Sequence, residues 1–290
     1  MRSALLAAAA ALALAACGQP PAPETAPPAA SKPEVALYAL DCGRIAVSDA
    51  DGFADDGSFK GVARDFVDPC YLIRHPAGDL LWDAGMPDAL NAQAEPLASG
   101  PYSITMPKTL AGQLQELGLG FSDIEFFSIS HSHFDHLGNG GALAAAATFL
   151  VDAEERAHMF REEARQDAQT FPLYAALESA KTTLIEGDGD HDVFGDGAVK
   201  IVAAPGHTPG HRALLVQLPQ AGAVLLSGDM FHLAESREKR TVPRFNTNRE
   251  ETLASIDKLE ALAAETQARL VRQHVPEDFA ALPAFPEALR

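Results

Sequence analysis

The sequence predicts one α/β (α+β) domain in which two β-sheets carry helices on their outer sides. The chain has 290 residues and is 47% hydrophobic, which is enough to bury a full core. Short apolar runs typical of strands fall into two groups along the chain, and helix-like segments follow each group. The sequence contains no internal repeat and no sign of a second domain.

The first 33 residues are expected to lie outside this domain. Arg2 precedes an apolar run, residues 5–16, that is too short to span a bilayer as a stable helix. The run ends in Leu-Ala-Ala-Cys-Gly at positions 14–18, which resembles a bacterial lipobox. The resemblance implies a signal peptide at 1–16, a lipid on Cys17 and, because glycine follows the cysteine, sorting to the outer membrane facing the periplasm. The alternative is an ordinary secretory signal that is cut near the same alanines.

Residues 17–33 are rich in proline and alanine. This composition predicts a semi-rigid, extended tether that holds the enzyme off the membrane. The folded domain is therefore expected to comprise residues 34–290.

The first group of strands begins with residues 35–40, whose weak alternation predicts a buried strand. A long, acidic and irregular segment, 43–68, follows. Residues 71–75 and 80–83 then predict a β-hairpin around a Pro-Ala-Gly-Asp turn.

A helix is expected where Leu110, Leu114 and Leu117 recur at helical spacing before two glycines. The remaining elements are expected in this order: a helix-like stretch at 141–147, a strand at 148–151, one or two helices within 152–180, strands at 182–186, 200–203, 214–218 and 223–226, and a helix at 250–268.

Two cysteines remain in the domain, Cys42 and Cys70, each at an end of a predicted strand. Neighbouring strands would bring them within bridging distance, and an oxidising periplasm would allow a disulfide. The alternative is a pair of small buried thiols. The sequence leaves this choice open.

The most informative run of the chain is His-Ser-His-Phe-Asp-His at 131–136, directly after the apolar stretch 124–130. Imidazole nitrogens and carboxylate oxygens are the ligands that zinc binds. In an extended backbone His131 and His133 point the same way, because alternate residues share a face. Asp135 and His136 then follow on the next bend, where they can reach a second ion.

Two ions held about 3.5–4 Å apart need more ligands than one such run provides. His207, Asp229 and His274 each follow a strand-like apolar run. Loops at strand ends commonly carry catalytic residues, because a rigid scaffold holds them. These three side chains are therefore the best candidates for completing a dinuclear site.

In this pattern the chain resembles the metallo-β-lactamase superfamily, whose HxHxDH signature matches residues 131–136 and whose three later ligands follow in the expected order. The resemblance implies an αββα sandwich and two Zn²⁺ ions, with other divalent transition metals as alternatives. It implies the following metal ligands: His131, His133 and His207 for one ion, Asp135, His136 and His274 for the other, and Asp229 between them. His211 is read as a residue that packs behind the ligands.

Segments 37–43, 70–75 and 80–85 make the chain look most like the N-acyl homoserine lactonase branch. This resemblance implies opening of a lactone ring by a metal-bound hydroxide, with Asp135 able to pass a proton to the leaving group. Asp83 matches a turn residue that orients a metal-binding histidine in that superfamily. The bridging Asp229 argues against β-lactam cleavage, because the lactamase branches lack it.

One position departs from the lactonase pattern. Several lactonases place a tyrosine three residues after the bridging aspartate, where this chain has His232. An imidazole can also donate a hydrogen bond or a proton, so His232 is a candidate catalytic residue. The change motivates an alternative, a phosphotriester or aryl-ester hydrolase on the same scaffold. A second alternative is a surface lipoprotein that binds metal without catalysis.

Loops 43–68 and 91–107 are expected to form the substrate's acyl pocket, with candidate lining residues Phe53, Phe59, Met86 and Met106. The formal charge of −18 argues against a nucleic-acid partner, whose phosphates would be repelled. The expected partner is a small lactone or ester. The membrane is expected to be contacted only through a lipid on Cys17, and the oligomeric state, a homodimer included, stays open.

Overall fold

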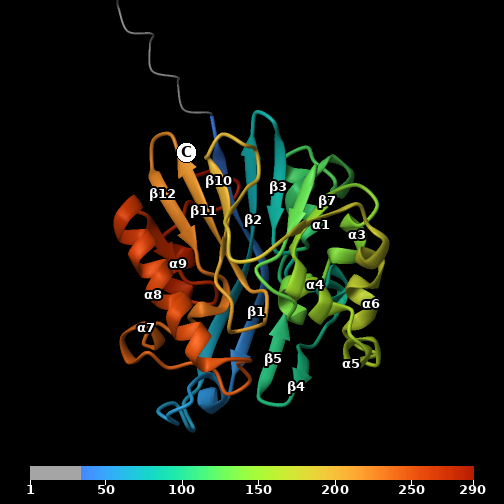
Figure 1. Cartoon of the computed structure of the whole chain (residues 1–290). Coiled ribbons are helices and arrows are strands. Elements are labelled where there is room, and N and C mark those ends of the chain that lie inside the picture. The colour runs from blue at the N-terminus through green and yellow to red at the C-terminus, as the bar shows by residue number, and fades with distance from the viewer. Residues whose placement is uncertain (1–33) are drawn as a thin grey trace, which may run out of the picture. The chain divides into compact units, whose positions relative to one another are not determined.

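Two β-sheets stack face to face in residues 34–290, the part of the chain that the computed structural model describes, and helices cover the outer face of each sheet (Figure 1). These residues belong to one compact unit, residues 32–290. The expected signal peptide 1–16, the anchor Cys17 and the tether 17–33 lie outside the described residues and stay predictions. Within the described range, the helices are too short or too polar to cross a bilayer.

The first sheet has eight strands in the order β4-β5-β1-β2-β3-β6-β7-β8. β1 to β3 pair antiparallel, whereas β3, β6, β7 and β8 pair parallel. The strand bounds are β1 Ala36–Val47, β2 Arg64–His75, β3 Gly78–Trp82, β4 Leu97–Ser99, β5 Tyr102–Thr105, β6 Phe126–Ser128, β7 Thr148–Asp152 and β8 Thr182–Ile185.

The second sheet has five strands in the order β13-β12-β11-β10-β9. Its pairs are antiparallel except for β12 and β13, which run parallel. The strand bounds are β9 His191–Asp192, β10 Val199–Ala203, β11 Arg212–Leu218, β12 Gly222–Leu226 and β13 Arg269–Val271.

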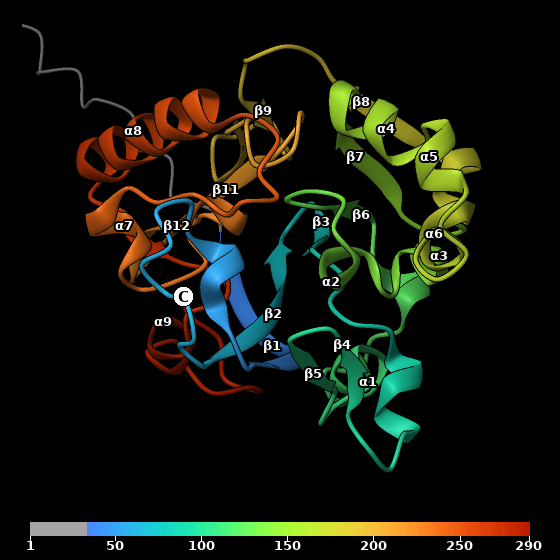
Figure 2. The ribbon, with the colours of Figure 1, turned by 90° about the horizontal axis from the view of Figure 1, so that it is seen from below.

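The helices are short except for α8, whose first turn is capped by the Asn248 side chain as it accepts a hydrogen bond from the Glu251 backbone N–H. Viewed from below, α8 lies across the second sheet, while α4 and α5 lie beyond β7 and β8 (Figure 2). The helix bounds are α1 Leu110–Glu116, α2 Phe134–Leu137, α3 Gly140–Leu143, α4 Ala153–Met159, α5 Glu162–Arg165, α6 Phe171–Tyr174, α7 Ser236–Lys239, α8 Arg249–Thr266 and α9 Pro276–Ala280.

Three apolar clusters hold these layers together. The central cluster joins the two sheets, with Tyr71 and Trp82 from the first facing Ile201 and Leu214 from the second. A second cluster packs the first sheet against α1, α3, α4 and α6, and a third packs the second sheet against α8. The layer order is therefore helix, sheet, sheet, helix, which confirms the αββα prediction.

Several predicted elements differ in extent from the observed ones. β1 continues to Val47 instead of ending at residue 40, because Arg44 to Val47 pair with both β2 and β5 after a register irregularity. The expected irregular segment 43–68 is therefore wrong at both ends. The expected helices within 152–180 form as short pieces, α4, α5 and α6, and the expected helix at 141–147 is only the short α3. β4, β5, β9, α7 and α9 were not predicted.

Cys42 and Cys70 form a disulfide between β1 and β2, with their Cα atoms 5.8 Å apart. The disulfide packs closely against the turn that follows β3. Gly85 has a φ of +57°, and a Cβ there would lie 2.2 Å from the Cβ of Cys42, so only glycine fits. The same turn packs against Gly138, whose added Cβ would lie 2.3 Å from the Gly85 carbonyl oxygen. The disulfide thus supports the turn that abuts α2.

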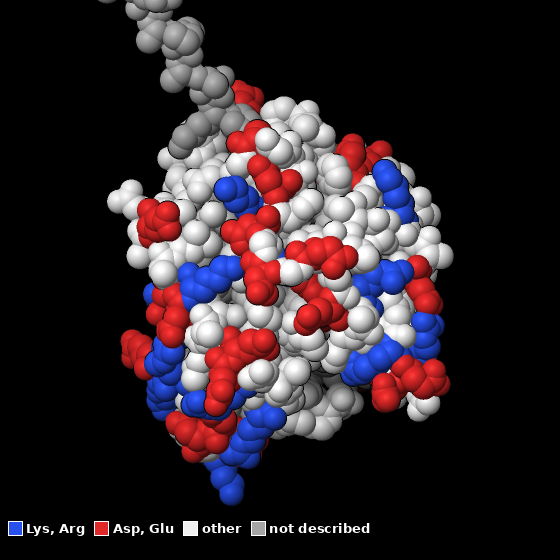
Figure 3. Space-filling view, in the orientation of Figure 1, with Lys and Arg blue, Asp and Glu red and all other residues white. Residues whose placement is uncertain are grey.

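Charged side chains of both signs are interspersed on the face shown in Figure 3. Between α7 and α8, Arg237 pairs with Glu260 and Arg240 pairs with Asp257. Exposed pairs of this kind contribute little to stability, about 0–1 kcal/mol each. They do place the positive side chains beside acidic partners on a chain whose formal charge is −18.

Candidate metal centre

The loop after β6 and the first turn of α2 present the histidine-rich run. Asp83, directly after β3, binds two residues of this segment, Ser130 and His136. Its carboxylate accepts hydrogen bonds from the Ser130 backbone N–H at 2.6 Å and from the Ser130 hydroxyl at 3.0 Å, and it contacts Nδ1 of His136 at 3.0 Å. Nε2 of His136 is thereby turned toward the centre, as the resemblance implied for Asp83.

The other three predicted ligands lie at strand ends of the second sheet. His207 follows β10, Asp229 follows β12 and His274 follows β13. Nδ1 of His274 donates to the Val67 carbonyl at 2.9 Å, which leaves its Nε2 free to face the centre. Because these strands end at the same edge of the sheet, residues far apart in sequence meet there.

His211 lies behind the ligand groups and contacts the backbone of Asp229. Its Nδ1 donates to the Ala204 carbonyl at 3.0 Å, and its Nε2 accepts the Asp229 backbone N–H at 3.0 Å. The tautomer is therefore fixed by a carbonyl on one side and an N–H on the other. The structure places His211 behind the ligands, as the sequence suggested.

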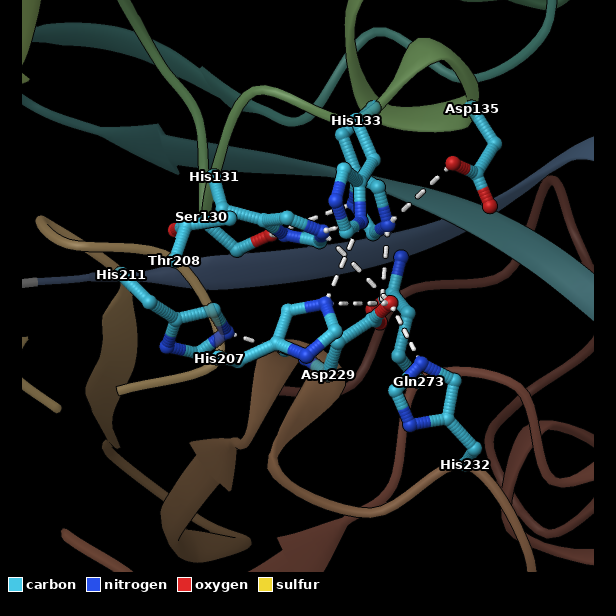
Figure 4. Close-up of polar contacts among 12 residues, drawn as sticks. Ser130, His131, His133, Asp135, His207, Thr208, His211, Asp229, His232 and Gln273 are labelled. Atoms are coloured by element: carbon cyan, nitrogen blue, oxygen red, sulfur yellow. Dashed lines mark hydrogen bonds and ion pairs between the residues drawn. The ribbon is translucent and has the colours of Figure 1, made fainter. Parts of the chain in front are cut away.

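Asp229 lies between two groups of imidazoles (Figure 4). Its Oδ2 is 3.6 Å from Nε2 of His131 and 3.6 Å from Nε2 of His207. Its Oδ1 is 3.5 Å from Nε2 of His136 and 3.0 Å from Nε2 of His274. One carboxylate thus faces both groups, with one oxygen toward each.

All seven side chains predicted as ligands come together in this way. In the first group, Nδ1 of His133 is 2.8 Å from Nε2 of His131 and 3.2 Å from Nε2 of His207. In the second group, Oδ1 of Asp135 is 3.9 Å from Nε2 of His136, and Oδ2 of Asp135 is 3.7 Å from Nε2 of His274. Within these two groups the ligand atoms are close enough to hold an ion in common.

The donor set fits a pair of metal ions. Nε2 of His136 and Oδ1 of Asp229 are buried and make no hydrogen bond within the described residues. Buried polar atoms without partners are rare, and imidazole with carboxylate is the ligand chemistry of zinc. The residues of the site therefore suit divalent transition metals.

Protonation in the metal-free protein differs between the two groups. Burial holds the pKa values of His131 and His207 well below the ordinary value and lowers that of His133 to about 4. Burial acts the same way on His274, but the carboxylates of Asp229 and Asp135 outweigh it and raise its pKa to about 9. The first group is thus ready to bind metal, whereas metal must displace a proton from the second.

Glu155 on α4 ties the two ligand loops together and was missed by the sequence analysis. Its side chain is buried, with 1% of the residue exposed. Oε1 accepts the backbone N–H of Ser132 at 2.7 Å and its hydroxyl, between His131 and His133. Oε2 accepts the Thr208 hydroxyl at 2.7 Å and the Gly210 N–H at 3.0 Å, just after His207. Its sequence context, an acidic helix, gave no signal of this role.

His232 lies at the centre as well. Its Nε2 is 3.0 Å from Oδ2 of Asp229, and its ring stacks on that of His274 with centroids 5.7 Å apart. Phe53 lies 5.2 Å from the same ring between centroids. His232 therefore lies between ligand residues and an aromatic residue of the cavity that the ligands also line.

That cavity has a volume of about 200 Å³ and opens beside the ligands. Of the expected pocket residues only Phe53 lines it; Phe59, Met86 and Met106 are buried in the core instead. The lining residues that sequence reasoning missed are Ile45, Phe66, Tyr102, Phe134 and Phe245. Ile45, Phe66 and Tyr102 lie within the segments expected to form the pocket, 43–68 and 91–107, whereas Phe134 and Phe245 come from elsewhere in the chain.

The remaining histidines lie elsewhere. His75 stacks on Phe194 at 4.0 Å between centroids and contacts Asp196 at 2.9 Å. His158 lies on α4 and His191 in β9. None of the three belongs to the ligand groups.

Comparison with known proteins places these observations in context. The family model described as the Metallo-beta-lactamase superfamily matches residues 64–274. The N-acyl homoserine lactonase AttM of Azorhizobium caulinodans is 27% identical over 264 residues, covering 88% of this chain and 97% of that protein. The N-acyl homoserine lactonase of Bacillus cereus is 29% identical over 225 residues, covering 75% and 85%.

Solved structures agree with these relatives. An N-acyl homoserine lactone hydrolase with the product N-hexanoyl-L-homoserine bound at its catalytic metal centre superposes with a TM-score of 0.72. It is 26% identical in sequence, and the match covers 88% of this chain and 98% of that one. The similarity therefore spans the described domain.

Proposed function

Because this chain belongs to the metallo-β-lactamase superfamily and is a metal-dependent hydrolase, we propose that it opens the lactone ring of N-acyl homoserine lactones or related esters. Its N-acyl homoserine lactonase relatives support the substrate class. The observation that carries the proposal is the position of the Asp229 carboxylate. Each of its oxygens faces a different group of imidazoles, and the residue also lines a largely apolar cavity. Such a substrate pairs a polar ring with an apolar chain, and the two halves of the site match it.

The proposed cofactors are two zinc ions. His131, His133 and His207 would hold one, Asp135, His136 and His274 the other, and Asp229 would contact both. When bound, such a pair of ions lowers the pKa of water and polarises the scissile carbonyl.

The chain's own residues orient the substrate and move protons. Asp135 lines the cavity next to His274, so its carboxylate can carry a proton to the departing ring oxygen. His232 lines the same cavity, and its ring N–H can donate a hydrogen bond to an ester oxygen. The aromatic walls exclude water from around the acyl group.

The test is turnover of N-hexanoyl homoserine lactone by purified protein loaded with zinc. Ring opening is monitored through the proton that the carboxylic acid product releases. Ring opening that stops with EDTA and returns with zinc supports the proposal. Turnover of aryl esters or phosphotriesters without any lactone opening would refute it.

The second candidate, a phosphotriester or aryl-ester hydrolase, is favoured by His232 and by the aromatic cavity. It is tested with His232→Tyr, which restores the residue of several lactonases. Loss of phosphotriester turnover in this variant would support the second candidate, and unchanged turnover would count against it. A protein that binds zinc but turns over none of these substrates would instead favour the alternative of a metal-binding surface lipoprotein without catalysis.

We also propose that a lipid on Cys17 anchors the enzyme to the outer membrane, facing the periplasm. The lipobox-like segment supports this, and the Cys42–Cys70 disulfide suits an oxidising compartment. Labelled palmitate should enter the wild-type protein but not Cys17→Ser, and the variant should leave the membrane fraction. Equal labelling of both proteins would disprove the anchor.

A further inference from the structure

We infer that Phe53 and Phe245 form a fastened aromatic gate, which restricts the group beside the scissile carbonyl to a short acyl chain or a single aryl ring. This inference rests on the proposed function, because it concerns the substrate of the same site. It adds a size limit and names the residues that set it.

The two phenylalanines come from distant loops and meet over the ligands. Phe53, at the end of a short 3₁₀ turn, lies 5.5 Å from Phe245 between ring centroids, nearly perpendicular to it. Phe245 also lies 5.9 Å from the rings of His133 and His207. With 45% of its surface exposed, Phe245 forms the outer rim of the cavity.

Two arginine–aspartate pairs fasten these loops to each other. Arg244 binds both carboxylate oxygens of Asp51, at 2.7 and 3.1 Å, and its backbone N–H donates to the Gly52 carbonyl at 2.9 Å. Arg249, at the start of α8, makes a single contact with Asp55, from Nε to Oδ2 at 2.5 Å. Figure 2 shows the loop of Phe53, in blue, beside the orange segment that carries α7. Together with the Arg244–Gly52 backbone hydrogen bond, these partly exposed pairs keep the two rings beside each other.

The walls behind the gate are apolar. Phe53 packs edge-on against Phe66 at 4.9 Å and against Tyr102 at 6.1 Å between centroids. Ile45 and Phe134 complete the lining away from the ligands. The charged groups that line the cavity all belong to the ligand cluster, so the wall facing the acyl group favours an uncharged, apolar group.

The size of the cavity sets the limit. Its volume is about 200 Å³. A cavity of roughly 150 Å³ lined by similar side chains accommodates benzene. The space beyond the ligands thus holds one ring or a short chain. Phe53 and Phe245 both line this space and Phe245 lies at its rim, so a longer chain is expected to meet these two rings.

The experiment compares four substrates of the zinc-loaded full chain: γ-butyrolactone, which has no side group, and the hexanoyl, phenylacetyl and dodecanoyl homoserine lactones. For the wild-type protein we expect kcat/KM to be roughly tenfold higher for the hexanoyl and phenylacetyl compounds than for the dodecanoyl compound. The difference should reside mainly in KM, because the gate binds the side group and not the reacting atoms.

Phe245→Ala should reduce the preference for the hexanoyl and phenylacetyl compounds over the dodecanoyl compound severalfold. The variant should bind the two short substrates more weakly and admit the long one. Arg244→Ala should shift the ratio in the same direction while both rings are retained. Leu184→Ala is the matched control, because Leu184 is an equally exposed apolar residue, 46%, on strand β8 away from the site. It should leave every ratio unchanged. Zinc content and thermal melting of each variant show that it is folded.

The outcomes distinguish a failure of the proposed function from a failure of the proposed gate. If γ-butyrolactone and all homoserine lactones are left intact, the proposed function fails and the gate fails with it. If lactones are opened but the dodecanoyl compound is as good a substrate as the hexanoyl one, the size limit is wrong and the function stands. If Phe245→Ala and Arg244→Ala both keep the wild-type ratio, the gate residues are wrong.

Discussion

Replacing Glu155 by glutamine is expected to loosen both loops that carry the first group of ligands. The carboxylate accepts four hydrogen bonds, two at each oxygen, from Ser132 on one side and from Thr208 and Gly210 on the other. Glutamine keeps one oxygen and turns an NH₂ group toward the other two donors. The hydroxyl can rotate to accept, but a backbone N–H cannot.

Glu155→Gln therefore leaves one buried N–H without a partner, which should lower the free energy of unfolding by about 1–3 kcal/mol. Glu155→Ala leaves both backbone N–H groups unpaired and adds a cavity, so a loss of about 3–5 kcal/mol is expected. Since His131, His133 and His207 flank the affected residues, zinc affinity should fall roughly 10–100-fold.

Two assays measure these effects. Urea unfolding of the chelated, metal-free protein gives the change in stability, and titration against a chromophoric chelator gives the zinc affinity. Glu154→Gln is the matched control, since Glu154 is the exposed neighbour on the same helix. The reasoning is refuted if Glu155→Gln matches this control in both assays, because the four contacts would then not hold the loops.

Three further outcomes are expected. EDTA should lower the melting temperature, because ions that bind only the folded protein stabilise it and their removal leaves buried imidazole nitrogens without a partner; an unchanged melt would argue against a metal centre. Replacing Cys42 and Cys70 by serine should cost about 3–4 kcal/mol in urea unfolding, given their sequence separation of 28, and a loss below 1 kcal/mol would contradict this. Burial raises the pKa of Asp278, but hydrogen bonds from Arg272 outweigh it and hold the pKa below the ordinary value, so the pair stabilises the fold fully above about pH 4 and less as the pH falls through the lower folded pKa. Asp278→Asn should lose stability at pH 7 and lack this acid-dependent loss, whereas parallel pH curves for the two proteins would show that the pair contributes nothing.

The convergence of the candidate ligands could be predicted from the sequence because their signal is local. The run at 131–136 carries donor chemistry at a density that ordinary loops lack, and His207, Asp229 and His274 each follow a recognisable strand. Strand ends meet at one edge of a sheet, so the position in each element was enough to expect convergence.

The extent of several elements could not be predicted for a different reason. Arg44 to Val47 lie in a segment that is acidic and expected to be irregular, but they are extended because β2 and β5 lie on either side. The region 152–180 has helical composition, yet it forms only the short helices α4, α5 and α6 and a 3₁₀ turn. The extent of β1 thus depends on strand partners that are distant in sequence, which local propensity does not contain.

By itself the sequence determined the chemistry of this protein: which side chains can bind metal, in what order, and on which kind of scaffold. Only the tertiary structure decided what surrounds them, namely the carboxylate of Glu155 behind two ligand loops and Phe245 opposite Phe53. The physical reason is range. Donor atoms are a property of each residue, whereas a hydrogen bond or an aromatic contact between segments nearly 200 positions apart exists only after the sheets have paired and brought the loops together.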